Sequence, residues 1–204
     1  VTGVQTCALP ISWRELGLRA PTTVVAEVEE SWKNSPPRRA DNWPQSEHVT
    51  WTFPGNDLID GPELTVEWFD GAMLPPQEAR DLNPTANYPL EAALLVGTEG
   101  AILHQHTAGP QLLPKAKYAA YERPKPAPRD HYRHFVDACL GGEKTEANFA
   151  QTGPMTETIL LGTVAIRCFG QKLTWDAAAM KFPNCPEAER YLRRQYRDGW
   201  QVVQ

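Results

Sequence analysis

Two stretches of the 204-residue chain decide its fold: residues 22–29, T-T-V-V-A-E-V-E, and residues 154–167, P-M-T-E-T-I-L-L-G-T-V-A-I-R. The first is rich in β-branched residues, which suit a pleated and half-buried surface, so it predicts a strand. The second has a proline where a helix begins and apolar residues on or near one face, so it predicts an amphipathic helix. Its Gly162 would permit a close approach to a neighbouring element.

Further strand-like segments lie between these two stretches. Alternating residues at 48–53 and 63–69 flank a turn-rich insert, so we expect two neighbouring antiparallel strands. A second pair, 92–96 and 101–104, brackets Gly97-Thr98-Glu99-Gly100, whose glycines can both adopt positive φ and therefore indicate a hairpin. Residues 31–47 contain three prolines and no periodic pattern, so we expect them to form a loop.

The helical patterns follow the Pro-rich linker at 123–128. In residues 130–140 the apolar side chains recur at helical spacing, with Asp130 as the cap and Gly141-Gly142 as the stop. Residues 172–175 suggest a short strand, and 187–197 a charged helix. Strands that come first and helices that come later indicate an α+β fold, with a mainly antiparallel open β-sheet and helices packed on one face.

Composition excludes several classes of function. The net charge of -5, with acids and bases mixed along the chain, gives no basic stripe for nucleic acid. No stretch approaches the roughly 20 apolar residues that span a bilayer, so we expect no membrane partner. The four cysteines form no C-x-x-C pair and leave the redox compartment open. Localisation is equally open between cytoplasmic and exported.

The first residues differ in origin from the rest. Residues 1–11, V-T-G-V-Q-T-C-A-L-P-I, resemble the translation of a short-read sequencing adapter along their whole length. We therefore exclude them, and Cys7 with them, from the reasoning about the fold. Residues 12–204 are interpreted as one domain.

Four histidines are candidate substrate-binding residues. His104 and His106 end a predicted strand two positions apart, so both imidazoles face the same side. His131 and His134 open a predicted helix and are neighbours on its surface, where they could hydrogen-bond a polyol. Neither pair has an evident third ligand, so no metal site is predicted. Strand-end exposure and helix capping with packing remain the alternative roles.

Motifs for a complete enzyme are missing from the chain. There is no G-x-G-x-x-G between a strand and a helix, so no cofactor-binding residue is assigned. There is also no G-x-S-x-G and no cysteine in a recognisable histidine-partnered context. Lys125-Pro126 lies in the Pro-rich linker and is interpreted as a spacer. No catalytic residue is predicted.

The second half of the chain carries a series of motifs that resemble those of a known family. They are His131-x-x-x-Phe135-Val136-Asp137-Ala138-Cys139-Leu140-Gly141-Gly142, Phe149, Gly153-Pro154-Met155-Thr156-Glu157, Leu161-Gly162-x-x-Ala165-x-Arg167, Leu173-Thr174-Trp175-Asp176, Lys181-Phe182-x-Asn184, Glu187-Ala188, and Tyr191-Leu192-Arg193-Arg194-x-Tyr196-Arg197-x-Gly199-Trp200. In this order they resemble the bacterial-type C-terminal domain of Gfo/Idh/MocA oxidoreductases. Upstream, Trp68-Phe69-Asp70-Gly71 and Gly97-Thr98-Glu99-Gly100 are similar to strand-turn elements of the same family.

The resemblance implies a parent enzyme that transfers hydride between NAD or NADP and a hydroxyl-bearing carbon of a sugar, inositol or glycoside. Residues 13–28 resemble the stretch that follows the family's G-D-x-G-x-H helix, which is absent here together with the N-terminal Rossmann domain. The fragment alone is therefore expected to be inactive and to bind no cofactor. It would supply one wall of a pocket for a carbohydrate-like small molecule, and its sheet face would form a homo-oligomer interface. An NAD-dependent glycoside hydrolase and a stand-alone carbohydrate-binding or interaction module are the alternatives.

Overall fold

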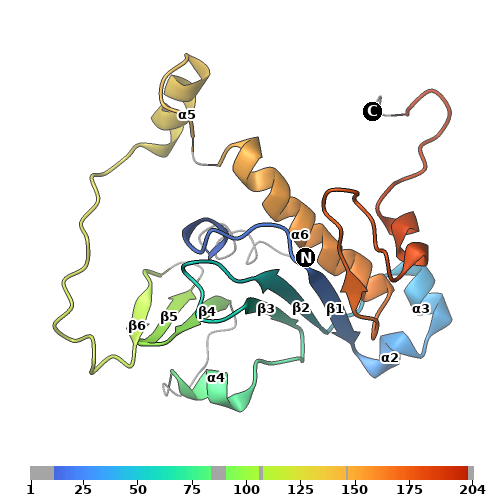
Figure 1. The fold of residues 1–204 in the computed structure, drawn as a ribbon, viewed down its shortest axis with the longest axis horizontal. Coiled ribbons are helices and arrows are strands. Elements are labelled where there is room, and N and C mark those ends of the chain that lie inside the picture. The colour runs from blue at the N-terminus through green and yellow to red at the C-terminus, as the bar shows by residue number, and fades with distance from the viewer. Residues whose placement is uncertain (1–11, 84–90, 106–107, 146, 202–204) are drawn as a thin grey trace. The chain divides into compact units, whose positions relative to one another are not determined.

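The computed structural model describes residues 12–83, 91–105, 108–145 and 147–201 (Figure 1). The chain forms two compact units. The hairpin unit comprises Val1–Leu18 and Pro75–Thr156, and the sheet-helix unit comprises Arg19–Leu74 and Glu157–Gln204. The prediction that residues 12–204 form one domain stays a prediction, and the two units are described separately.

A four-stranded antiparallel sheet forms the centre of the sheet-helix unit. Its strand order is β3-β2-β1-β7, with β1 at Thr23–Val28, β2 at Glu47–Pro54, β3 at Glu63–Asp70 and β7 at Leu173–Thr174. The strands predicted at 22–29, 48–53, 63–69 and 172–175 are confirmed, as is the antiparallel pairing of the second and third. Alternation along β2 buries Val49, Trp51 and Phe53 on one face of the sheet.

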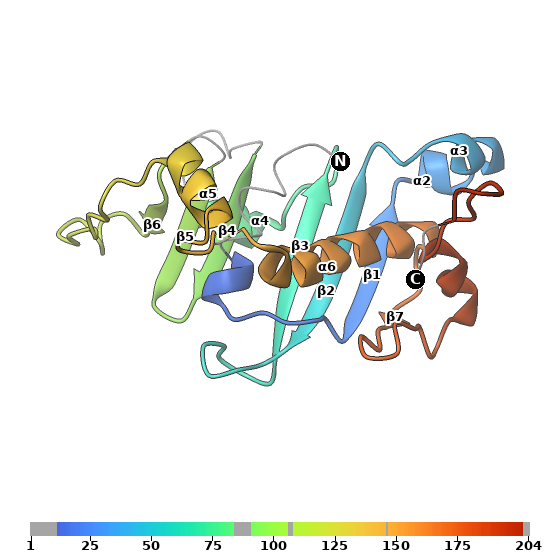
Figure 2. The same cartoon turned by 90° about the horizontal axis from the view of Figure 1, so that it is seen from above.

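The part of helix α6 (Phe149–Arg167) that belongs to this unit covers that buried face (Figure 2). The close approach expected at Gly162 is confirmed, because a Cβ there would lie 2.5 Å from Cζ2 of Trp51. The indole Nε1 of Trp51 donates to the carbonyl oxygen of Thr158 at 2.9 Å. A glycine on the helix therefore makes room for a large ring on the strand, and the ring's polar atom is satisfied by the same helix.

Helix α6 begins earlier than the sequence predicts. It starts at Phe149 and contains Pro154 in its interior, whereas the prediction placed Pro154 near the first helical position. Asn148 accounts for the earlier start, because its Oδ1 accepts a hydrogen bond from the backbone N–H of Gln151 at 3.3 Å. Asparagine is among the preferred helix caps, so this local bond extends the helix ahead of the proline.

The prediction of a loop at 31–47 is wrong in part. Two short helices occupy much of it, α2 at Glu30–Lys33 and α3 at Pro36–Asp41. Trp32 is only 1% exposed and its Nε1 donates to the carbonyl oxygen of Asn42 at 3.3 Å, so burial of one indole holds both helices. Pro36 lies in the first turn of α3, where its missing N–H costs nothing.

The charged helix predicted at 187–197 is also wrong in type and length. The structure has a 3-10 helix, η1, at Pro186–Tyr191. Only Ala188 is buried within it, so packing provides little reason to extend a regular helix.

The hairpin unit contains a separate three-stranded antiparallel sheet, with β4 at Ala92–Gly97, β5 at Gly100–Gln105 and β6 at Gln111–Leu113. The hairpin predicted from residues 92–96 and 101–104 is confirmed. Only Gly100 of its two glycines has positive φ, at 155°, and a Cβ there would lie 2.4 Å from the carbonyl oxygen of Leu113. Strand β6 and helix α4 (Gln77–Asp81) were not predicted.

Helix α5 (His131–Cys139) confirms the helix predicted at 130–140. Asp130 caps it by accepting a hydrogen bond from the N–H of Arg133 at 2.7 Å. Gly141 ends it with φ at 89°, and Gly142 donates back to the carbonyl oxygen of Asp137 at 2.8 Å. With its antiparallel sheets and its helices, the chain has the predicted α+β fold with an open antiparallel sheet. Among the described residues, no helix is long and apolar enough to cross a membrane.

Candidate functional site

A pocket with a volume of about 210 Å³ lies beside β6 in the hairpin unit. It is built from β6 and the chain that follows, and its lining residues are Gln111, Leu112, Lys115, Tyr118, Tyr121 and Arg123. The volume is below the 300–1,000 Å³ typical of sites for drug-sized ligands, so the pocket suits a single small ring better than a dinucleotide.

The β4–β5 hairpin positions one wall of this pocket. The hydroxyl of Tyr118 donates to the carbonyl oxygen of Glu99 at 2.6 Å. Nζ of Lys117 donates to the same carbonyl oxygen at 2.5 Å and to the Glu99 carboxylate at 2.7 Å. This pairing lowers the pKa of Glu99 and raises the pKa of Lys117, so both groups are charged at neutral pH. The turn before β5 thus fixes residues 117–118.

The lining combines hydrogen-bond donors with aromatic rings. Gln111, Lys115 and Arg123 offer N–H donors, and Tyr118 and Tyr121 offer ring faces that can lie against the C–H groups of a sugar. Within the described residues, Lys115 and Arg123 form no ion pair. Several hydrogen-bond donors placed around a small apolar surface can fix the orientation of a ligand that carries hydroxyl or carboxylate oxygens.

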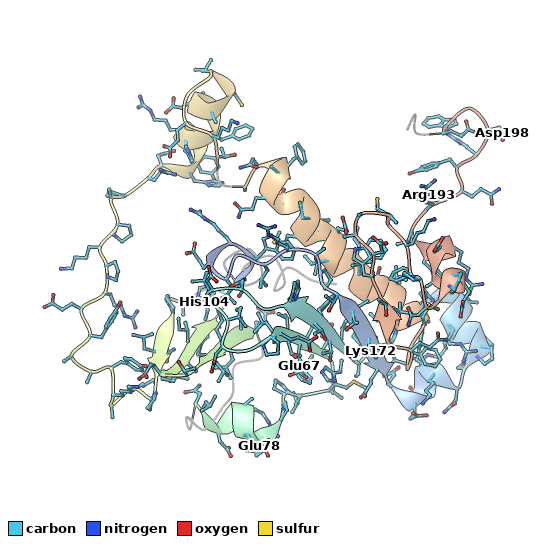
Figure 3. The ribbon with its side chains drawn as sticks, viewed as in Figure 1. Glu67, Glu78, His104, Lys172, Arg193 and Asp198 are labelled. Carbon is cyan, nitrogen blue, oxygen red and sulfur yellow. The ribbon has the colours of Figure 1, made fainter. Side chains whose placement is uncertain are left out.

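Of the four predicted histidines, the three that the structure describes do not line this pocket. His104, labelled in Figure 3, lies near the end of β5 and is half-buried, and His106 lies outside the described residues. His131 is exposed, with its ring centroid 5.4 Å from that of Tyr132. His134 is half-buried, and its Nε2 has no hydrogen-bond partner among the described residues. The described contacts join His104 to neither helix histidine, so the substrate-binding role of all four stays a prediction.

The pocket was not predicted, because residues 111–122 were assigned to no element and no site. The signal was present in residues 111–123, Q-L-L-P-K-A-K-Y-A-A-Y-E-R, where cations and tyrosines alternate with small residues. That pattern has no helical or strand period. The pairing of β6 with β5 and the hydrogen bonds that Lys117 and Tyr118 donate to Glu99 hold the segment in place.

The apolar side of helix α5 is open to solvent. Tyr132 is 80% exposed, Phe135 62% and Leu140 81%, and Phe149 at the start of α6 is 93% exposed. The helix predicted from the amphipathic pattern is therefore confirmed. Its apolar stripe is not buried by the described residues. Contiguous exposed apolar side chains of this size mark interaction surfaces or sites of self-association.

We expect the chain to self-associate through this stripe. Replacing Phe135 and Leu140 together by glutamine should weaken association roughly tenfold or more, because each large side chain contributes about 1.5–3 kcal/mol when buried. Light scattering over a concentration series measures the change. A matched control replaces Arg133 by glutamine and Asp137 by asparagine on the same helix, and should leave association unchanged. A wild-type chain that scatters as a clean monomer at every concentration would contradict the expectation.

The face of the four-stranded sheet opposite α6 carries mostly polar and β-branched side chains. His48 lies on it near the start of β2, where Nε2 is 2.9 Å from Oε1 of Glu67 and 3.2 Å from Oγ1 of Thr50. Its ring stacks on Phe69 with centroids 4.2 Å apart and planes 11° apart. Glu67 projects from β3 in Figure 3. The face continues through residues that are half-buried or exposed, namely Thr23, Val25, Glu27, Thr52 and Thr65.

A group of acids lies at one end of the same sheet. Glu47 of β2 is 6% exposed and is paired in register with Asp70 of β3 and Val28 of β1. Glu29 follows β1 and is held by Arg38, whose Nη2 lies 2.9 Å from Oε1 of Glu29. Burial, with the charges of Asp70 and Glu29, raises the pKa of Glu47 to about 7. This carboxyl therefore changes charge near neutral pH.

No group of three or more histidine, cysteine, aspartate or glutamate side chains suited to a metal ion occurs in the part of the chain that the structure describes. Comparisons of the chain with protein-family models, with curated proteins and with solved structures found no match.

Proposed function

We propose that the chain is the C-terminal part of an NAD(P)-dependent oxidoreductase of the Gfo/Idh/MocA type that acts on a hydroxyl of a sugar, inositol or glycoside. The observation that carries the proposal is that residues of the family-like motifs lie at buried or closely packed positions of the fold. Gly162 makes room for Trp51, Trp175 is 6% exposed, and Phe182 is fully buried beside it with ring centroids 4.8 Å apart. The motifs therefore coincide with positions where the fold restricts the choice of residue.

In this proposal the chain supplies binding surface and no redox chemistry. The residues present do not fit a dinucleotide, because the sequence has no glycine-rich turn between a strand and a helix and the pocket beside β6 is small. NAD or NADP would bind to an N-terminal Rossmann domain outside this sequence. No residue of this chain is assigned to catalysis, and the chain alone is expected to be inactive.

We propose that the residues lining the pocket beside β6 form one wall of the binding site for a carbohydrate-like substrate. Its cationic side chains suit a ligand with hydroxyl or carboxylate oxygens, and its tyrosine rings suit a ligand with an apolar ring face. The open face of the four-stranded sheet is the proposed homo-oligomer interface of the parent enzyme, distinct from the α5 stripe through which the isolated chain is expected to self-associate. Its threonines, Val25 and the stacked His48–Phe69 pair form a mixed surface of the kind that non-obligate interfaces present.

Activity of the complete gene product tests the proposal. With NAD or NADP and a panel of sugars, inositols and glycosides, we expect substrate-dependent formation of the reduced nicotinamide, while the 204-residue chain alone gives no turnover above background. Release of free sugar from a glycoside without net reduction would instead indicate the NAD-dependent glycoside hydrolase. Sugar binding by the chain alone, with no nicotinamide-linked activity in the complete gene product, would indicate a carbohydrate-binding module. Gel filtration of the same protein reports the oligomeric state.

A further inference from the structure

Two of the cysteines, Cys168 and Cys185, lie together in the core of the sheet-helix unit. Cys168 directly follows α6 and is 9% exposed, and Cys185 precedes η1 and is 2% exposed. The two side chains lie close enough to interact, and both thiols are free. The thiol of Cys185 also donates to Oε1 of Gln171 at 3.2 Å.

The backbone around the pair holds the two segments in contact. Asn184 joins them, because its Nδ2 donates to the carbonyl oxygen of Lys172 at 2.7 Å and its Oδ1 accepts from the N–H of Thr174 at 2.8 Å. On the other side, the N–H of Gln171 donates to the carbonyl oxygen of Cys168 at 3.1 Å. Figure 3 shows Lys172 at the beginning of β7. The bonds of Asn184 therefore fix Cys185 against the turn that follows Cys168.

We propose that Cys168 and Cys185 are a disulfide site, at which the two thiols join when the protein meets a low-molecular-weight disulfide. The Cys185 thiolate attacks one sulfur of the external disulfide, whose S–S bond breaks and releases one thiol. The Cys168 thiolate then attacks the Cys185 sulfur of the mixed disulfide and releases the second thiol. Both cysteine sulfurs are oxidised, both external sulfurs are reduced, and the two cysteine protons leave with the released thiols.

Burial makes this reaction slow without local opening. It raises the pKa of Cys168 to about 11 and raises that of Cys185 as well, so little thiolate is present at neutral pH. The segment around Cys185 has little regular structure beyond η1 and the bridge between Asp176 and Lys181. Opening there would admit the oxidant and accommodate the mixed disulfide. Once formed, the bond would fasten the irregular C-terminal segment to the end of α6.

The test uses the full chain with Cys7 and Cys139 replaced by serine, because Cys139 is exposed and would form bonds between chains. After incubation with oxidised glutathione we expect two fewer thiols per chain and a peptide map in which the fragments containing Cys168 and Cys185 are joined. The closed loop is on the order of 15 residues, so the melting temperature should rise by about 6–12 °C. Dithiothreitol should reverse both changes.

Cys168→Ser and Cys185→Ser in the same background are the matched controls, and neither should show the rise in melting temperature. If these variants do not fold, the peptide map of the protein that keeps Cys168 and Cys185 still tests whether the disulfide forms. Retention of both thiols after prolonged incubation, addition of glutathione to both cysteines without an internal bond, or a fall in melting temperature on oxidation would each overturn the proposal.

Discussion

Replacing Trp51 by alanine is expected to lower the free energy of unfolding of the sheet-helix unit by about 3–5 kcal/mol. Trp51 is 4% exposed and lies against Gly162, and its Nε1 donates to the carbonyl oxygen of Thr158. Alanine removes the ring from the contact between β2 and α6 and leaves a buried carbonyl oxygen without its donor. The helix cannot move in to fill the space without breaking other core contacts, so a cavity remains.

Urea denaturation followed by circular dichroism measures this loss. Trp51→Phe restores most of the ring but not the N–H, and should cost about 1–3 kcal/mol. Trp200→Ala is the matched control, because Trp200 is 64% exposed and its removal should change stability by less than about 0.5 kcal/mol. If Trp51→Ala cost no more than the control, the contact between β2 and α6 would not be the core of this unit.

Replacing Glu47 by glutamine is expected to stabilise the protein above neutral pH and not below pH 5. Burial, Asp70 and Glu29 raise the pKa of Glu47 from its ordinary value of 4.5 to about 7. A carboxyl with a raised pKa binds its proton more tightly when the protein is folded, so stability falls as the pH rises from about 4.5 to about 7. The cost above that range is at most roughly 3 kcal/mol. Glutamine carries no charge and avoids this cost.

Thermal or urea unfolding at a series of pH values tests this prediction. The difference in stability between Glu47→Gln and wild type should be near zero at pH 5 and reach its full value by pH 8. Asp70→Asn removes one of the two repelling charges and should give part of the same effect. Glu63→Gln, on the exposed start of β3, is the matched control. A difference that does not change with pH would show that Glu47 does not titrate in this range.

The elements that the sequence predicted well are those whose signal is local. Alternation in β1, β2 and β3 places one set of side chains inside, so the strands and the pairing of β2 with β3 followed from the pattern alone. The same alternation places Glu47 on the face of Val49 and Trp51, and its burial could have been inferred. The cap at Asp130 and the glycine stop at Gly141 likewise fixed both ends of α5.

The features that were missed depend on contacts between distant residues. Helices α2 and α3 form around the buried Trp32, whose indole is satisfied by Asn42, and the prolines of this stretch suggested a loop instead. The pocket beside β6 depends on Glu99 binding Lys117 and Tyr118 across the hairpin unit. No periodic pattern marks such bonds. Each histidine pair was predicted from local spacing, at a strand end or on a helix surface, and local spacing does not show whether the two pairs meet; the described contacts do not join His104 to His131 or His134.

The most direct test of the central claim is to read the source DNA upstream of the codon for Ser12. We predict a continuous reading frame that encodes a G-D-x-G-x-H helix next to this chain and, before it, a nucleotide-binding domain with a G-x-G-x-x-G turn. A frame that opens near Ser12 with no such domain before it would contradict the oxidoreductase, and would leave a binding module as the function of this fold.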